Sequence, residues 1–283
     1  MPGYQTRILL AVPLVIALLV LVACSSAPPG PKAGTPAFFW QAAKETWVAK
    51  DYMKTLDHLA QVARTENEFT TNALAMRLVV NAGLVRAYMD LAENYETGAR
   101  ANVFKPMPLR KVSSDYMKQA ELRALDFGES YLKFAKAAAG QTNYKLEFAF
   151  PAADMTEIRE IKKIVAGSLP DEATMAAVER RKVQQSLALA VAAAVGAPND
   201  IAKAQAAFAS GSAEVPRETF TLAMANNLYD QATLFSRKKL DNPQRVELFV
   251  NEAKDALKAV KESKETKSLV AKLDKLLKES KER

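Results

Sequence analysis

The pattern of apolar positions separates an N-terminal apolar run from a long helical body. After Pro36, apolar residues recur every three or four positions and turn-forming residues are confined to short joints, as in amphipathic helices. Ala37–Lys50 places Phe39 and Trp47 on one stripe, and Asp51 then begins a second helix. We therefore expect a short antiparallel helix hairpin here, followed by an all-α body.

Two longer helices are expected next. Phe69–Gly98 carries apolar residues around so much of its circumference that it should lie at the centre of the body. Pro106 and Pro108 then interrupt the chain, because proline is excluded from a helix interior. The second long helix is expected to begin at Ser114 or Asp115, whose side chains are suited to an N-cap.

The remaining helices follow the same rhythm. Their predicted N-caps include Asp171, Asn199 and Asn242, the last followed by Pro243 at the first helical position. The predicted ranges are Asp154–Ala166, Asp171–Val195, Asn199–Ser210, Pro216–Lys239, Asn242–Glu262 and Ser268–Glu282.

Tyr144–Phe150 departs from this rhythm, because large apolar residues alternate with Lys145, Glu147 and Ala149 at the period of a strand. A single strand among helices would have no pairing partner. We therefore expect an extended crossover that packs its large side chains on the body. The alternative is an edge that pairs with another protein.

The N-terminal run Ile8–Val22 has the length of a secretory signal sequence and is shorter than the roughly 20 residues of a membrane-spanning helix. It ends at Leu21-Val22-Ala23-Cys24, which resembles a bacterial lipobox. The resemblance implies cleavage after Ala23 and lipidation of Cys24, and stable membrane anchoring follows from the acyl chains. The alternative is an ordinary signal peptide with an unrelated cysteine.

The residues after Cys24 indicate where the protein would be held. Ser25 and Ser26 stand where lipoproteins retained in the inner membrane usually carry Asp, so the resemblance implies the outer membrane. We expect the body to face the periplasm. Residues 24–36 are rich in Ser, Ala, Pro and Gly. Such a segment predicts a tether of about 35 Å at about 3 Å per residue.

Residue counts restrict the chemistry. Cys24 is the single cysteine and His58 the single histidine, which excludes intrachain disulfides, His-rich metal sites and Cys/His nucleophilic pairs. The net charge is +7. The segment from Lys254 to Arg283 contains ten basic residues and six acidic ones. This excess of positive charge would favour binding to anionic lipid, lipopolysaccharide phosphate or an acidic protein. The alternative is a solvated helix face whose Lys and Glu alternate for solubility.

One joint in the chain has a family resemblance. Lys50-Asp51-Tyr52, continuing to Leu56 and Leu59, resembles the turn between the two helices of a tetratricopeptide (TPR) unit. Asn226–Ala232 is a weaker match, and no strict 34-residue period is present. The resemblance implies antiparallel hairpins stacked as a TPR-like right-handed solenoid, with an irregular helical bundle as the alternative.

No catalytic motif accompanies these features. The chain lacks G-x-S-x-G, a Walker-type glycine loop, H-E-x-x-H and an Asp-rich calcium loop. His58 and the carboxylate pair Glu157 and Glu160 have ordinary structural explanations, namely partial burial and intrahelical ion pairing. Arg100 and Asn102 are weak candidates for anion contact. We therefore expect no enzyme activity, no cofactor and no metal.

Four residues are candidates for contact with a ligand or partner. Trp40 and Trp47 lie seven residues apart on one helix face, and they would either frame a ligand or pack in the core. Asn227 and Gln231 lie among large apolar residues, as does Asn226. An amide in such a setting needs hydrogen-bond partners, which a neighbouring helix, solvent or a bound ligand would supply.

The predicted organisation is a signal peptide at 1–23, a tether at 24–36, a helical repeat-like domain at 37–264 and a basic C-terminal helix at 265–283. The leading hypothesis is a lipid-anchored envelope scaffold that binds another envelope protein or peptide through its helical surface. The alternative is a periplasmic small-molecule carrier, or a transporter-associated lipoprotein, with a cavity in the helical body. Nucleic acid is not an expected partner, because aromatic residues are not interleaved with the basic ones in the tail.

Overall fold

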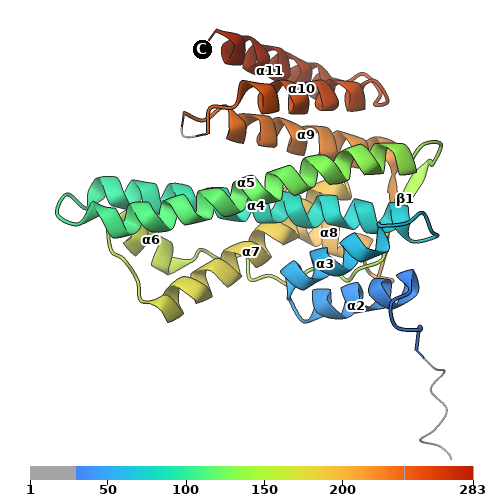
Figure 1. Ribbon diagram of the computed structural model, residues 1–283, viewed down its shortest axis with the longest axis horizontal. Coiled ribbons are helices and arrows are strands. Elements are labelled where there is room, and N and C mark those ends of the chain that lie inside the picture. Colours follow the sequence, from blue (N-terminus) through green and yellow to red (C-terminus); the bar gives the residue numbers. More distant parts are fainter. Residues whose placement is uncertain (1–29, 239, 283) are drawn as a thin grey trace, which may run out of the picture.

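The computed structural model describes residues 30–238 and 240–282 (Figure 1). The predicted signal peptide, Cys24 and the first residues of the predicted tether lie outside this described part. At the centre are two long antiparallel helices, α4 (Thr70–Ala101) and α5 (Pro106–Ala137). Most of the residues of α4 are buried, which confirms the central position predicted from its wide apolar face.

The N-terminal hairpin consists of α2 (Pro36–Val48) and α3 (Tyr52–Val62). The Asp51 side chain accepts a hydrogen bond from the backbone N–H of Lys54, as expected of an N-cap. Lys50 has a φ of 62° at the turn, so the left-handed backbone reverses the chain between the two helices. The hairpin packs on α4 through α3.

The other elements lie on two sides of the central pair (Figure 1). On one side, α7 and the short helix α6 pack on α4, and α8 packs on α7. On the other side, α9, α10 and α11 form successive layers. Their bounds are α6 Arg159–Val165, α7 Glu172–Ala194, α8 Ile201–Ala207, α9 Arg217–Phe235, α10 Pro243–Leu257 and α11 Lys264–Lys281.

A two-stranded antiparallel ribbon joins the two sides. Strand β1 (Asn143–Leu146) pairs with β2 (Ala213–Pro216), with Asn143 opposite Pro216. The expectation of an unpaired crossover at Tyr144–Phe150 was wrong, because the chain supplies its own second strand. The predicted alternation is present, since Tyr144, Leu146 and Phe148 are all buried.

Two helix starts differ from the sequence expectation. Helix α5 begins at Pro106 rather than at Ser114 or Asp115; both prolines lie in its first turn, where helix N–H groups have no intrahelical partner to lose. At α8 the N-cap is Asp200, whose side chain accepts from the N–H of Lys203, instead of Asn199. The φ of Asn199 is 64°, so it belongs to the preceding turn.

Several predicted ranges were too long at one end or displaced. Helix α6 begins at Arg159 instead of Asp154, because Asp154 closes a local turn by accepting from the N–H of Thr156. Helices α9 and α10 end earlier than predicted. Helix α11 begins earlier, at Lys264, because Ser263 and Thr266 form a capping box.

The helices share one principal core. Buried residues form a continuous cluster that extends from Trp40 in α2 to Leu276 in α11. The basic C-terminal helix therefore packs on the body through Leu269, Leu273 and Leu276. Its lysines reach acidic partners, as in the pair Lys281–Glu247 at 3.3 Å, which fits the solvated-face explanation of the basic tail.

The all-α class is confirmed, and the order of contacts is that of an irregular bundle. After α5 the chain returns across the molecule, and α6 and α7 pack mainly on α4; α9 then joins α5, α7 and the ribbon. Hairpins consequently do not follow one another along a single axis. Within the described ranges, no helix combines the length and apolar character needed to cross a bilayer.

Candidate functional site

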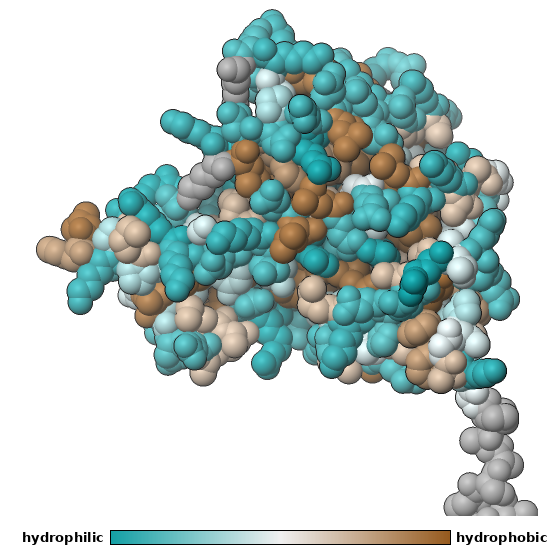
Figure 2. Space-filling view, in the orientation of Figure 1, coloured by the Kyte–Doolittle hydropathy of each residue, from teal (hydrophilic) through white to brown (hydrophobic). Residues whose placement is uncertain are grey.

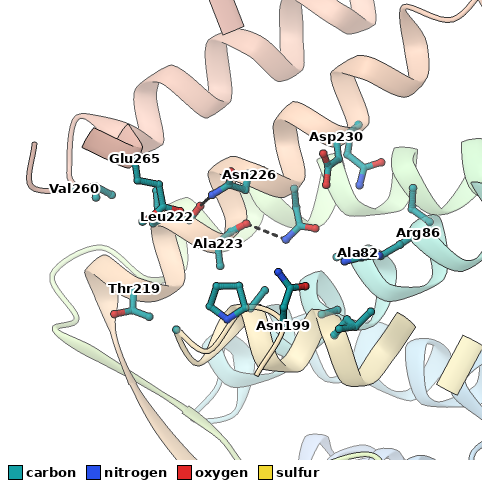
Figure 3. Close-up of a pocket in the computed structure, with 18 of the residues that line it drawn as sticks. Ala82, Arg86, Asn199, Thr219, Leu222, Ala223, Asn226, Asp230, Val260 and Glu265 are labelled. Atoms are coloured by element: carbon teal, nitrogen blue, oxygen red, sulfur yellow. Dashed lines mark hydrogen bonds between the residues drawn. The ribbon is translucent and has the colours of Figure 1, made fainter. Parts of the chain in front are cut away.

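A groove of about 1020 Å³ lies between α9 on one side and α4 and α7 on the other. The turn after α7 and the connection between α10 and α11 complete its walls. We call it the α9 groove (Figure 3). The lining residues used below are Arg86 and Asp90 of α4, Asn199 of the turn, Asn226, Asn227, Asp230 and Gln231 of α9, and Glu218, Lys261 and Glu265 near one end.

Helix α9 has two faces of different character. Phe220, Leu228 and Phe235 are fully or almost fully buried, and the helix packs on α5 and α10. The polar residues Asn226, Asn227, Asp230 and Gln231 recur at spacings of three and four toward the groove. Residues at those spacings share a helix face, so α9 places a polar strip along the groove.

Gln231 is the most enclosed polar side chain of this strip. Only 1% of its surface is exposed, and its Oε1 atom has no hydrogen-bond partner among the described residues. A buried carbonyl oxygen without a donor costs about 1–3 kcal/mol. A ligand N–H or O–H at this position would remove that cost.

Asn226 and Asn227 are half-buried and use their amide N–H groups within α9. Asn226 Nδ2 donates to the carbonyl of Leu222 at 3.0 Å, and Asn227 Nδ2 donates to the carbonyl of Ala223 at 2.9 Å (Figure 3). The donors are thereby occupied, and the Oδ1 atoms retain acceptor capacity. The strip therefore offers mainly acceptors to a ligand.

Asp230 adds a carboxylate to the acceptor strip. Solvent in the groove reaches this side chain, but protein surrounds the carboxyl, and the resulting desolvation raises its pKa to about 6 in spite of the opposing charges of Arg86 and Lys272. Arg86 projects from α4 on the other side of the groove (Figure 3). Neither side chain has an ion-pair partner within 4.0 Å in the described part of the chain.

The ends of the groove are held by defined contacts. At one end, the Glu218 carboxylate accepts from the backbone N–H of Lys261 at 2.5 Å, which ties α9 to the α10–α11 connection. At the α4 side, Asp90 pairs with Lys182 of α7 at 2.6 Å. Asn199 lies on the wall opposite Asn226 (Figure 3). The first contact ties α9 to its neighbouring wall, and the second ties α4 to α7 on the opposite side.

The two tryptophans lie elsewhere. Trp40 and Trp47 are each 4% exposed and make edge contacts with Phe148 at ring-centroid distances of 5.3 and 5.7 Å. The Trp47 indole N–H donates to the carbonyl of Ala149 at 2.8 Å. They fasten α2 to the segment after β1 and are not part of the α9 groove lining, whereas Asn227 and Gln231 are.

The weaker sequence candidates have structural partners. His58 is half-buried and stacks on Phe39 at 6.2 Å. Glu157 pairs with Lys162 at 2.8 Å. Asn102 Nδ2 donates to the carbonyl of Gly167 at 2.9 Å. No group of three or more His, Cys, Asp or Glu side chains in the described ranges is arranged to hold a metal ion.

Sequence reasoning missed Arg86, Asn199 and Asp230 as members of this site. The signal available for Asp230 was its position next to Gln231, within the same polar interruption of an apolar helix. Arg86 lies far from this segment in the sequence, and only the packing of α4 and α7 beside α9 brings it to the groove. Comparison with known proteins finds no matching family model, no matching curated protein and no matching solved structure.

Proposed function

We propose that this protein is a lipid-anchored envelope adapter that binds a basic segment of another envelope protein in the α9 groove. The observation that carries the proposal is the acceptor strip of α9, in which the buried Gln231 Oε1 has no donor among the described residues. Peptide N–H groups and basic side chains are the complementary donors.

The charges of the groove favour a cationic partner. Five acidic and three basic residues line it, but Asp90 and Glu262 are already paired with Lys182 and Lys267, and Arg237 with Glu93. Glu218, Asp230 and Glu265 remain, against Arg86 and Lys261. Asp230 is the carboxylate closest to the unpaired oxygen in sequence, and it has no ion pair of its own among the described residues. A Lys or Arg side chain, or an N-terminal amine, would supply both a charge for Asp230 and donors for the amides.

The dimensions favour a chain segment over a compact molecule. At about 1020 Å³ the groove lies at the upper limit of typical small-molecule sites, and it is partly open to solvent. A small donor-rich cation remains the second candidate, because the buried position of Gln231 would also suit an amine enclosed at the base of the groove.

The location is part of the same proposal. The lipobox at Cys24 and the residues Ser25 and Ser26 support attachment to the periplasmic face of the outer membrane. Intact mass measurement of the mature protein tests this directly: the chain is expected to begin at Cys24 and to carry acyl chains, and Cys24→Ser is expected to abolish them. A mature chain that keeps a free thiol would contradict the anchor.

The binding proposal is tested by crosslinking from defined positions in cells of the source organism. A photoreactive residue at position 226 in the groove is compared with one at position 122, since Leu122 is exposed on α5. We expect position 226 to capture one recurrent envelope protein through a segment rich in Lys or Arg, and position 122 to capture none.

The captured segment is then synthesised, and its affinity is measured by calorimetry. We expect the double variant Asp230→Asn, Gln231→Met to weaken binding at least tenfold, with Asp57→Asn as the matched control on α3. Equal affinity of the double variant and the control would contradict the proposal. Release of a small amine from the purified protein, with no protein crosslink at position 226, would favour the second candidate.

A further inference from the structure

The turn between α4 and α5 presents an exposed apolar tip. Val103, Phe104 and Met107 are 77%, 91% and 67% exposed, and in Figure 2 brown and tan atoms protrude from the end of the molecule where Figure 1 places this turn. Leu169 is also exposed. Three large apolar residues within five positions are seldom so exposed on the surface of a monomeric protein in water.

Hydrogen bonds and close helix packing fix the backbone at the base of the tip. Asn102 Oδ1 accepts from the backbone N–H groups of Phe104 and Lys105 at 3.2 and 2.9 Å, while Asn102 Nδ2 donates to Gly167. Below it, α4 and α6 are so close that a Cβ on Gly98 would stand 2.0 Å from the carbonyl oxygen of Ile164. Phe104 projects from the backbone that these contacts fix.

The chain on either side of the tip carries charges of one sign. From Thr97 to Ser114 the chain contains Arg100, Lys105, Arg110 and Lys111 and no acidic residue. All four basic residues are exposed. No ion pair is present for Lys105, Arg110 or Lys111 within the described ranges, although many other lysines of the body have acidic partners.

We propose that this tip, Val103 to Met107 with its flanking Arg and Lys residues, inserts into the interface of a membrane that contains anionic lipid. An aromatic and aliphatic apex fits the boundary between headgroups and acyl chains, and the flanking cations fit the headgroup phosphates. The convex shape of the apex suits a deformable lipid surface. The inference does not depend on the occupant of the α9 groove or on lipidation of Cys24.

Insertion of the tip into a membrane would affect how the protein is oriented relative to that membrane. It lies at one end of the α4–α5 pair, and the described chain begins near the other end (Figure 1). Helices of 32 residues are about 48 Å long. Attachment at both ends would fix the direction of the long axis relative to the membrane, whereas an N-terminal tether alone would leave the body free to rotate.

Vesicle binding of residues 30–283 tests the proposal, because this chain contains the whole continuous core and omits Cys24. Sedimentation is measured with vesicles of phosphatidylcholine alone and with phosphatidylglycerol added. We expect binding to the anionic vesicles, a loss on the order of tenfold with Phe104→Asp, and no loss with Val48→Asp. Val48 is the matched control, since it is 71% exposed on α2.

A second measurement locates the contact. The chain has no cysteine after position 24, so Phe104→Cys and Val48→Cys each accept one environment-sensitive fluorophore. We expect a blue shift on adding anionic vesicles for the label at 104 and none at 48. Absence of binding to either vesicle, or binding that Phe104→Asp leaves intact, would overturn the proposal. Self-association that Phe104→Asp abolishes, without vesicle binding, would assign the tip to a second copy and would also overturn it.

Discussion

Two polar clusters, one on α4 and one on α9, contain similar residue types but differ in whether their carboxylate has partners within the chain. In the first, Arg77 of α4 pairs with Asp126 of α5, and Asn81 Nδ2 donates to the other oxygen of that carboxylate at 2.8 Å. In the second, Asp230 and Gln231 of α9 lie in the groove without such partners among the described residues. The carboxylate of the first cluster has its partners within the chain, although Arg77 Nε and Asn81 Oδ1 have none among the described residues. In the second cluster it is the acceptors, Gln231 Oε1 and the Asp230 carboxylate, that lack partners there.

The difference has an energetic meaning. A buried carboxylate needs a compensating charge and hydrogen bonds, and its loss leaves the partner cation uncompensated. An unpaired buried acceptor lowers stability by about 1–3 kcal/mol, and a ligand that donates to it recovers that cost. The comparison therefore predicts large losses of stability from substitutions in the first cluster and small or opposite effects in the second.

The largest effect is expected for Asp126→Ala. Arg77 and Asp126 have side chains only 13% and 18% exposed, so the variant leaves a largely buried guanidinium without its partner. The free energy of unfolding should fall by about 3 kcal/mol, measured by urea denaturation at pH 7. If the free energy of unfolding falls by less than about 1 kcal/mol, solvent compensates the charge of Arg77. The two clusters would then not differ in their contribution to stability.

Asn81→Leu is expected to cost less. The substitution removes the donor to Asp126 and leaves the Arg77–Asp126 pair in place. Because hydrogen bonds to charged groups contribute about 1.5–3 kcal/mol, the free energy of unfolding should fall by about 2 kcal/mol. In the background of Asp126→Ala the same substitution should cost much less, and a double-mutant cycle measures this coupling.

Gln231→Met should have the opposite sign or no effect on the isolated protein. It replaces a buried side chain with an unpaired oxygen by an apolar one of similar length, so the free energy of unfolding should stay equal or rise by up to about 1 kcal/mol. Thermal unfolding without ligand provides the measurement. A loss of 2 kcal/mol or more would mean that Gln231 is held by protein contacts and is unavailable to a ligand.

The remaining effect is a pH dependence at Asp230. Its pKa in the folded protein is about 6, above the ordinary value of 3.8, so its contribution to stability is present below pH 4 and is lost as the pH rises through 6. Asp230→Asn does not titrate, and its melting temperature relative to the wild type should therefore rise between pH 4 and pH 8. Asp57→Asn serves as the control. A difference that is constant with pH would contradict the assigned desolvation.

Much of the fold could be predicted because it follows from local patterns. The wide apolar face of Phe69–Gly98 indicated the central helix, and Asp51 marked the start of α3. The position of α5 could not be derived in the same way, because Pro106 and Pro108 indicate equally a break or a first turn. Strand β2 was missed because Ala213–Pro216 has only four residues, too few for an alternation to be recognised.

The candidate site was predictable only in part. Asn227 and Gln231 were identified because amides interrupt the apolar pattern of their helix. The meeting of Asp230 with Arg86 and Asn199 depends on three elements distant in sequence, and the choice between Asn199 and Asp200 as a cap depends on a backbone angle. The burial that distinguishes Trp40 and Trp47 from groove residues is likewise a property of the assembled body.

The β1–β2 ribbon has a consequence for the order in which the chain assembles. Pairing Asn143 with Pro216 closes a loop of roughly 70 residues, for which the entropic cost is about 4 kcal/mol. The α4–α5 hairpin, by contrast, needs only a local turn. The hairpin should therefore form early and act as the template on which the loop containing α6, α7 and α8 closes late, so that the α9 groove exists only once folding is nearly complete.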